Sequence, residues 1–438
     1  MMYYAYYYVK KYSIYQNLFF FSIINLKRKK HFFDYMKHLE GIYYMIELSL
    51  EQIRNFRLYT HHLDRIFAKT DIEKLVGACG MQNTPPGAWE TALCNRVPGC
   101  SLSEMDDLLY TEKSLLQAWS LRGIPVVFPI SQSHIFLSAL IAEEGEPWIY
   151  TSGISLALDF LQMDFNDLFR ILQQVIPQLD DCTIMSKTSL DQTLADWMLP
   201  LIPENKRVLW SHPSMYGSPD KQTVGGAVVS FLLRPCAWKG LVVFGERQGT
   251  SPMFTSYKNW TGRSLIPEKD ACKELVRKYL HCYGPANVNH FVNWLGCSGK
   301  QGRRMWNTVS EEMEPVSALG KKAYILSSDR ERLLQPDSTE RELLLLGGHD
   351  PFLDQRDREV LQPDKTLHKQ IWKLVTNPGA VLYRGEIIGI WNAKKKKNGM
   401  EITITLWKSI PDRPYLHALA EAYAAFRQIR LLGVEIMT

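Results

Sequence analysis

Apolar positions in residues 45–150 recur at helical spacing along two stripes, and a short apolar run follows them. One stripe consists of Ile53, Phe56, Leu58, Leu63 and Ile66, and the other of Leu108, Leu109, Leu115, Leu116 and Trp119. The second stripe predicts an amphipathic helix that includes residues 115–123. The run 124–129 predicts a buried strand, and a further helix is expected to begin at Ser131 or Ser133.

This order of elements returns twice, although no sequence repeat accompanies it. Residues 153–200 have apolar residues at helical spacing, and an apolar segment, 224–234, leads into a strand at 241–245. In the third stretch Asn287 is expected to cap a helix, and residues 323–326 form the strand. The helices of that stretch are expected at 271–283, 288–295 and 300–309. Helices followed by strands are typical of a winged helix, so we predict three tandem winged-helix units. Their bounds are 45–150, 151–266 and 267–342.

The pattern changes to strands from Leu343 onward. β-Branched and aromatic residues with Gly and Asn-Gly turns predict strands there, closed by a helix over 415–431. The strands are expected at 343–346, 381–383, 387–391 and 402–407. We therefore predict a small β-barrel-like C-terminal domain over 343–438, and an α+β fold class for the whole chain.

The first 44 residues differ in composition from the rest and lack helical periodicity. Their apolar run, 18–26, is shorter than the roughly 20 residues that span a bilayer. It also lacks the small-residue cleavage site of a signal peptide. We interpret residues 1–44 as a non-homologous extension, disordered or mis-annotated upstream sequence, with the functional start at Met45. A peripheral membrane anchor is the alternative.

Charge gives no reason to expect nucleic-acid binding by the chain as a whole. The sequence has 51 Lys and Arg against 46 Asp and Glu, but residues 1–44 hold seven of the basic and two of the acidic ones. The remainder therefore holds 44 of each sign, and a DNA-binding interpretation must rest on local patches. The eight cysteines include no Cys-x-x-Cys pair, which predicts reduced thiols and no metal site. The motifs of P-loop kinases, α/β-hydrolases and zinc metalloproteases are missing, so those classes have no support.

A polar corner interrupts the first unit. Gln82-Asn83-Thr84 follows an apolar helix and precedes Pro85-Pro86-Gly87, which forbids a continuous helix there. A second helix is expected over 88–97. From the residues alone, Gln82 and Thr84 either cap a helix end or form a polar site held in fixed geometry.

The corner and several later segments resemble the winged-helix DNA glycosylases of the AlkZ/YcaQ superfamily. In that family a Gln-x-Gln or Gln-x-Asp motif precedes a Pro-containing turn. Here Gln82-Asn83-Thr84 stands at that place and differs at its third position, Thr84. The later segments, in the family's order, are 119–123, 279–286, 291–296, 349–358 and 381–391. The resemblance covers most of the chain after Met45.

The resemblance implies a monofunctional DNA glycosylase that hydrolyses the N-glycosidic bond of alkylated purines, bulky or crosslinked ones among them, in DNA repair. Gln82 would order the attacking water, and Thr84 would hold the same water with its hydroxyl. Neutral groups suit this task because an N7-alkylated purine is already a cationic leaving group. Double-stranded DNA is the implied partner, with no cofactor, metal or membrane, and a cytoplasmic, nucleoid-associated monomer is expected. The alternatives are a non-catalytic winged-helix DNA-binding protein or transcriptional regulator, and an interaction scaffold.

Contacts to DNA are expected from one further set of residues. These are Asn83, His62, Arg122, Arg303, Arg304, Lys394, Lys395, Lys396 and Lys397. The lysines lie between two expected strands, where a basic hairpin can clamp phosphates, although such a run is often only a solvated tip. Of the adjacent pair His61-His62, one histidine is expected to pack and the other to point toward the Gln82 corner.

The segment 350–357 is densely charged. Internal salt bridges are one interpretation of Asp350, Asp354, Arg356 and Asp357. The other is that Asp350, Asp354 and Arg356 support the catalytic residues from behind.

Overall fold

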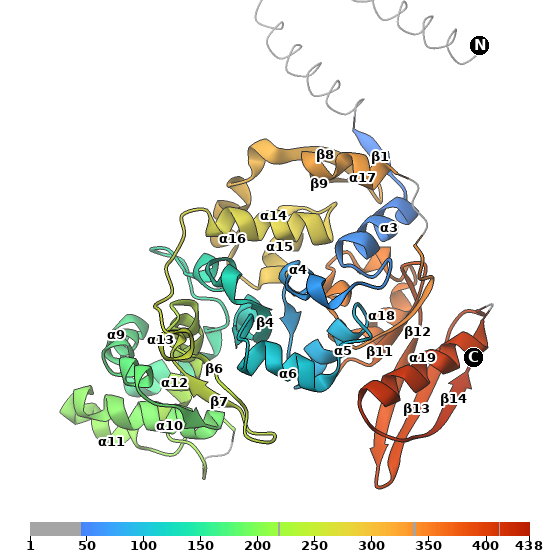
Figure 1. The fold of residues 1–438 in the computed structure, drawn as a ribbon. Coiled ribbons are helices and arrows are strands. Elements are labelled where there is room, and N and C mark those ends of the chain that lie inside the picture. Colours follow the sequence, from blue (N-terminus) through green and yellow to red (C-terminus); the bar gives the residue numbers. More distant parts are fainter. Residues whose placement is uncertain (1–44, 218–219, 336–338, 411) are drawn as a thin grey trace, which may run out of the picture. The chain divides into compact units, whose positions relative to one another are not determined.

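A computed structural model of the chain describes residues 45–438 except 218–219, 336–338 and 411 (Figure 1). The prediction for residues 1–44 lies outside these described residues. The chain divides into two compact units, 1–47 and 48–438, and the second contains everything that follows except the start of strand β1 (Ile46–Leu48). Within the described residues, no helix is both long and apolar enough to cross a bilayer.

The first part of the second unit mixes helices with a three-stranded sheet of order β2-β4-β3. Its helices are α3 (Leu50–Thr60), α4 (Ile72–Gly77), α5 (Ala88–Cys94), α6 (Leu102–Tyr110) and α7 (Ser133–Phe136). Its strands are β2 (Met81–Gln82), β3 (Leu115–Trp119) and β4 (Pro125–Pro129). The strand expected at 124–129 and the helix start at Ser133 are confirmed, while α5 ends three residues before the expected Val97.

The helix expected over 115–123 is wrong. Residues 115–119 form β3, which pairs antiparallel with β4, and Leu121–Gly123 is a tight turn between the two strands. The strand is buried on both faces, so its apolar residues do not alternate, and a short continuous apolar run has no periodicity that separates strand from helix. The first stripe is also shorter than expected, because α3 ends at Thr60 and Ile66 is 60% exposed.

The next part again combines helices with a three-stranded sheet. Its main helices are α8 (Ser155–Leu161), α9 (Phe165–Val175), α10 (Lys187–Met198), α11 (Arg207–Trp210), α12 (Val224–Trp238) and α13 (Tyr257–Thr261). Its strands β5 (Ile184–Met185), β6 (Val243–Phe244) and β7 (Met253–Thr255) form a sheet of order β5-β7-β6. The apolar segment 224–234 therefore belongs to a buried helix, α12, and only its sequel, 241–245, contains a strand.

The third part follows its sequence pattern closely. Helices α14 (Ala271–Tyr283) and α15 (Val288–Leu295) have the expected bounds, and α16 (Gly299–Asn307) differs from its expected bounds by one or two residues. Asn287 caps α15, since its side chain accepts a hydrogen bond from the backbone N–H of His290. Strand β9 (Lys321–Leu326) pairs with β8 (Met313–Ala318), which was not expected, and the short helix α17 (Arg330–Leu334) follows.

The last part contains a five-stranded sheet of order β10-β11-β12-β13-β14. Helix α18 (His368–Ile371) lies between β10 and β11 along the chain. Its strands are β10 (Leu343–Leu346), β11 (Gly379–Tyr383), β12 (Glu386–Lys396), β13 (Gly399–Leu406) and β14 (Leu431–Met437). Helix α19 (Arg413–Phe426) packs against it through Leu416, Ala420 and Ala424 (Figure 1). The expected helix over 415–431 runs too far, because Leu431 already belongs to β14, which lies parallel to β13. Strands β10 and β14 end the pairing order in the described residues, so the barrel-like closure is not confirmed.

The hydrophobic cores cross the expected unit boundaries. One core contains Phe136, Trp238 and Leu280, one from each of the three expected winged-helix units. Another joins Leu58 and Leu63 to the C-terminal sheet. The boundaries at 150, 266 and 342 remain predictions, and the corner at Gln82 lies where the first and last parts pack together.

Candidate functional site

The corner is held by the side chain of Asn83. Its Nδ2 donates to Gln117 Oε1 at 2.9 Å, and its Oδ1 accepts from the N–H of Gly87 at 2.8 Å. The peptide bond between Thr84 and Pro85 is cis, and Gly87, with φ +89°, is the residue just before α5. Because both ends of the Asn83 amide are used inside the protein, this residue braces the corner, and one N–H and one lone pair of Oδ1 are left for DNA.

Gln82 ends strand β2 and is half-buried, with its amide fixed by three partners. Its Nε2 donates to the carbonyl oxygen of Thr84 at 2.6 Å and to Nδ1 of His349 at 3.1 Å. Its Oε1 accepts from Arg122 at 3.4 Å. A flipped amide would face Arg122 with N–H and Thr84 with oxygen, so the orientation of Gln82 is determined. One lone pair of Oε1 remains to accept a hydrogen bond from a water or substrate.

His349 was not predicted as a site residue. Its Nδ1 must accept the Gln82 hydrogen bond, which places the proton of a neutral ring on Nε2. Burial lowers the pKa of His349 below its ordinary value, and the nearby Arg122 adds to this, while Asp354 opposes it. The neutral ring is thus the stable form at neutral pH. The sequence did carry a signal, because His349 begins the resembling segment 349–358.

Arg122 and Asp354 form the other side of the site. Arg122 has φ +58° in the turn between β3 and β4, and it donates to Asp354 Oδ2 at 2.7 Å and to the carbonyl of Trp294 at 3.2 Å. Asp354 therefore holds the guanidinium that contacts Gln82, and its supporting role stays a prediction. Thr84 is exposed, and within the described residues its hydroxyl has no hydrogen-bond partner.

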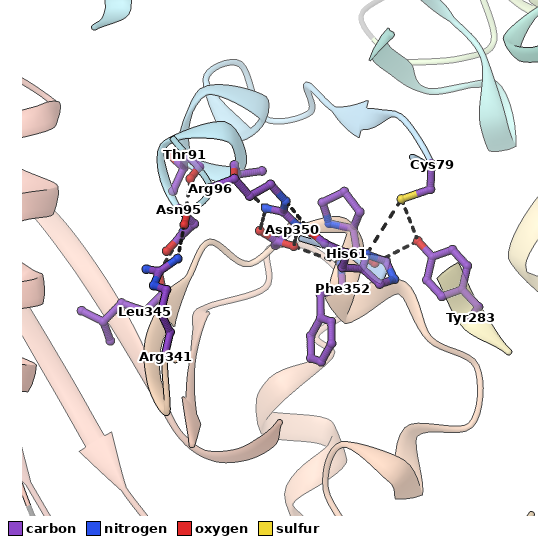
Figure 2. Close-up of polar contacts among 12 residues, drawn as sticks. His61, Cys79, Thr91, Asn95, Arg96, Tyr283, Arg341, Leu345, Asp350 and Phe352 are labelled. Atoms are coloured by element: carbon purple, nitrogen blue, oxygen red, sulfur yellow. Dashed lines mark hydrogen bonds and ion pairs between the residues drawn. The ribbon is translucent and has the colours of Figure 1, made fainter. Parts of the chain in front are cut away.

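A buried ion pair lies behind the corner (Figure 2). Arg96, just after α5, donates to both oxygens of Asp350 at 2.8 and 3.0 Å, and the two side chains are 2% and 0% exposed. Arg96 also donates to the carbonyl of His61, and Asp350 accepts from the N–H of Phe352. Since Asp350 is next to His349, this pair fixes the segment that bears the Gln82 partner.

A second buried arginine supports the same segment. Arg57 of α3 donates to Asp357 at 2.7 and 2.9 Å and to the carbonyls of Tyr283 and Gly284. It therefore ties α3 and α14 to the segment 350–357. Both interpretations of the charged segment are thus compatible, because its internal salt bridges also hold the site. Arg356 is half-buried, and no ion pair to it is present among the described residues.

The two histidines that follow α3 behave as packed residues. His61 is buried, and its Nε2 lies 3.0 Å from the carbonyl oxygen of Cys282. His62 lies against the ring of Phe67, and burial lowers its pKa to about 3. Within the described residues no contact joins His62 to Gln82, so the structure does not bring it into the corner. A neutral His62 also adds no positive charge for DNA.

The other predicted DNA contacts lie apart from the corner. Arg304 is engaged by Glu146 at 2.8 Å and by Glu143 at 3.0 Å, whereas Arg303 is exposed. Lys394 to Lys397 occupy the exposed end of the β12–β13 hairpin, where Lys396 pairs with Glu401 at 2.8 Å. All eight cysteines lie in described residues and carry free thiols, as expected. Among the described residues, no group of three or more His, Cys, Asp or Glu side chains is arranged to hold a metal ion.

Comparison with known proteins gives the corner its context. A family model described as "DNA glycosylase AlkZ-like" matches residues 75–426, which include every residue of the corner. The chain belongs to the AlkZ-like DNA glycosylase family. The resemblance and the expectation of a DNA glycosylase are confirmed.

A curated protein sequence and a solved structure from Streptomyces sahachiroi extend this result. The chain is 26% identical over 336 residues to its interstrand DNA cross-link repair glycosylase, covering 73% of this chain and 80% of that protein. The solved structure of the DNA glycosylase AlkZ from the same organism is similar with a TM-score of 0.69 at 20% identity, covering 90% of this chain and all of that one. This chain and the solved AlkZ structure therefore share a fold.

Proposed function

We propose that this DNA glycosylase removes alkylated purines, including crosslinked ones, from duplex DNA, and that Gln82 positions the attacking water. The amide of Gln82 supports this most directly: three partners fix it, and one lone pair of Oε1 is left over. The name of the relative, a cross-link repair glycosylase, supports the extension to crosslinked bases.

The reaction needs little acid catalysis. N7-alkylation places a positive charge on the purine, so when the C1′–N9 bond breaks, its electron pair neutralises the departing base. The water that donates a hydrogen bond to Oε1 then adds to the oxocarbenium-like C1′ and releases a proton to solvent. A fixed neutral amide contributes chiefly by holding the water in line, which is an effect of position. Thr84 Oγ1, exposed beside the corner, would be a second and weaker partner for that water.

The fold supports the same proposal. Each of the first three parts combines helices with a small antiparallel sheet or hairpin, and we propose that these are the three winged-helix units. They would hold duplex DNA, with the hairpin of Lys394 to Lys397 and the exposed Arg303 contacting phosphates. A nucleoid-associated monomer in the cytoplasm is part of this proposal.

A base-release assay tests it. The full-length protein should release 7-methylguanine from methylated duplex DNA and separate the strands of a duplex crosslinked through purine N7 positions. Binding without release from either substrate would make the non-catalytic DNA-binding protein the better interpretation. Release from the first substrate alone would remove the crosslink from the proposal.

A further inference from the structure

The loop between α18 and β11 exposes two adjacent apolar side chains. Leu374 and Val375 have relative exposures of 105% and 93%, above every other large apolar side chain in the described residues. Thr376 is also exposed, and so is Lys373. Such exposure does not stabilise the unbound protein, because the hydrophobic effect favours removing these side chains from water.

Both ends of this loop are attached to the segment that bears His349. Trp372 Nε1 donates to the carbonyl of Leu353 at 3.0 Å, and Asn377 Nδ2 donates to the carbonyl of Gly348 at 3.3 Å. A Cβ atom on Gly348 would lie 2.5 Å from the carbonyl oxygen of Asn377, so the loop packs directly on the backbone there. The tip is therefore presented from a fixed base, one residue from the His349 that holds Gln82.

Two basic side chains lie at or beside this base. The guanidinium of Arg358 lies 4.6 Å from the Trp372 ring centre, and Lys373 is next to the apolar pair. Arg356 is half-buried, and its Nε is a buried donor without a partner in the described residues. The acidic residues of the segment 349–358 are already paired: Asp350 with Arg96, Asp354 with Arg122 and Asp357 with Arg57. An apolar tip with cations at its base suits a partner that has stacked bases inside and phosphates outside.

We propose that Leu374 and Val375 enter the base stack of duplex DNA next to the damaged nucleotide and fill the space that this nucleotide leaves when it turns toward Gln82. This inference rests on the proposed function. Extruding a base costs stacking and pairing free energy, and an inserted apolar side chain compensates part of that loss. A protein partner is less consistent with the loop, because two side chains are far smaller than the roughly 800 Å² per partner of a stable protein interface.

The test uses a duplex with a tetrahydrofuran abasic analogue and a neighbouring 2-aminopurine, whose fluorescence reports local stacking. The full-length protein should change that fluorescence on binding. The double variant Leu374→Ser, Val375→Ser should lose the change, bind this duplex about tenfold more weakly and release 7-methylguanine at least tenfold more slowly. Its melting temperature and its affinity for undamaged duplex should stay those of the wild type, since both side chains are fully exposed.

Two controls separate the possible failures. Val208→Ser, at another apolar residue with 81% exposure, should behave like the wild type. The variant Leu374→Met should retain the fluorescence change, because it keeps apolar volume at the tip. A double variant within twofold of the wild type in fluorescence and base release would overturn the insertion. A wild-type protein that releases no base but still changes the fluorescence would contradict the proposed function and leave the insertion standing.

Discussion

Gln82 Nε2 lies 3.1 Å from His349 Nδ1, although 267 residues separate the two along the chain. The contact determines the tautomer of the histidine and, with Thr84 and Arg122, the orientation of the amide. The water-binding oxygen of the proposed mechanism is thus aimed by residues from the first and the last parts of the fold. Gln82, His349 and Thr84 can each be perturbed separately within this arrangement.

Removing the amide should abolish most of the catalysis. Gln82→Ala should slow base release from 7-methylguanine DNA by on the order of 10²-fold or more, the range expected for lost positioning. Affinity for undamaged duplex should change little, because an uncharged side chain releases no counterions. Single-turnover kinetics and a binding titration measure the two effects. The exposed Gln178→Ala is the matched control, and an equal loss in both variants would contradict the role of Gln82.

The protonation of His349 should set an acid limit. Burial lowers its pKa below the ordinary histidine value of about 6.5, so the ring stays neutral at and somewhat below that pH. Protonation gives Nδ1 a hydrogen, and Gln82 then loses its acceptor. Base release, corrected for spontaneous loss, should be constant from about pH 8 to 6.5 and should fall only in more acidic solution. His349→Asn, whose amide oxygen does not titrate, should be slower but flat over the acidic range. A wild-type rate that rises toward low pH would exclude this arrangement.

Thr84 should contribute less than Gln82. Its side chain is exposed, and its recorded contact to Gln82 is made by the backbone carbonyl. Thr84→Val keeps the shape and the carbonyl but removes the hydroxyl, so base release should fall by no more than about tenfold. Thr84→Gln restores the residue type of the family motif and should raise the rate. If Thr84→Val matched Gln82→Ala in its effect, the hydroxyl would be the principal water ligand.

The ion pair of Arg96 and Asp350 should matter chiefly for stability. Asp350→Ala leaves a fully buried guanidinium without its carboxylate, which typically costs about 3–5 kcal/mol of unfolding free energy. Urea or thermal unfolding should therefore show a clearly lower midpoint. Glu342→Ala removes the partner of Arg384 from an exposed pair and should leave the midpoint unchanged. Equal midpoints for the two variants would show that the buried pair is dispensable.

The four lysines of the β12–β13 hairpin should be tested by salt dependence. If they contact phosphates, changing Lys394 to Lys397 to Ala weakens binding for all sequences. The slope of log affinity against log salt then falls by about 1 for each lost contact. Lys396 already pairs with Glu401, so fewer than four contacts are expected. Replacing the same four with Arg should preserve the slope, and an unchanged slope in the Ala variant would mean a solvated tip.

Local signals in the sequence predicted much of this structure. Helices α14 and α15 have the expected bounds because each follows a clean apolar stripe, and Asn287 also caps α15. The short apolar runs are harder to predict: residues 115–119, expected in a helix, form a strand, and Leu431, expected to end a helix, begins β14. Such segments take their conformation from the strands they pair with, which lie elsewhere in the chain.

The candidate site also has features that local sequence predicts and features that depend on distant contacts. The corner at Gln82 follows from adjacent residues, since Pro85, Pro86 and Gly87 dictate it locally. The role of His349 depends on a contact between distant segments, which one sequence does not reveal. Arg304 and His62 were expected at DNA because charge and ring type are visible in a sequence. Their partners, Glu146 and Phe67, are visible only in the fold.

The distance along the chain between Gln82 and its partners has a consequence for protein synthesis. A ribosome completes the corner motif early, but His349, Asp350 and Asp354 emerge only after four-fifths of the chain has been translated. A nascent or proteolytically shortened chain that stops before His349 would carry the motif without the groups that orient it. Such a fragment would be expected to touch DNA without cutting bases from it. In the proposed mechanism, the long-range contact therefore makes base release depend on a chain that has been translated beyond Asp354.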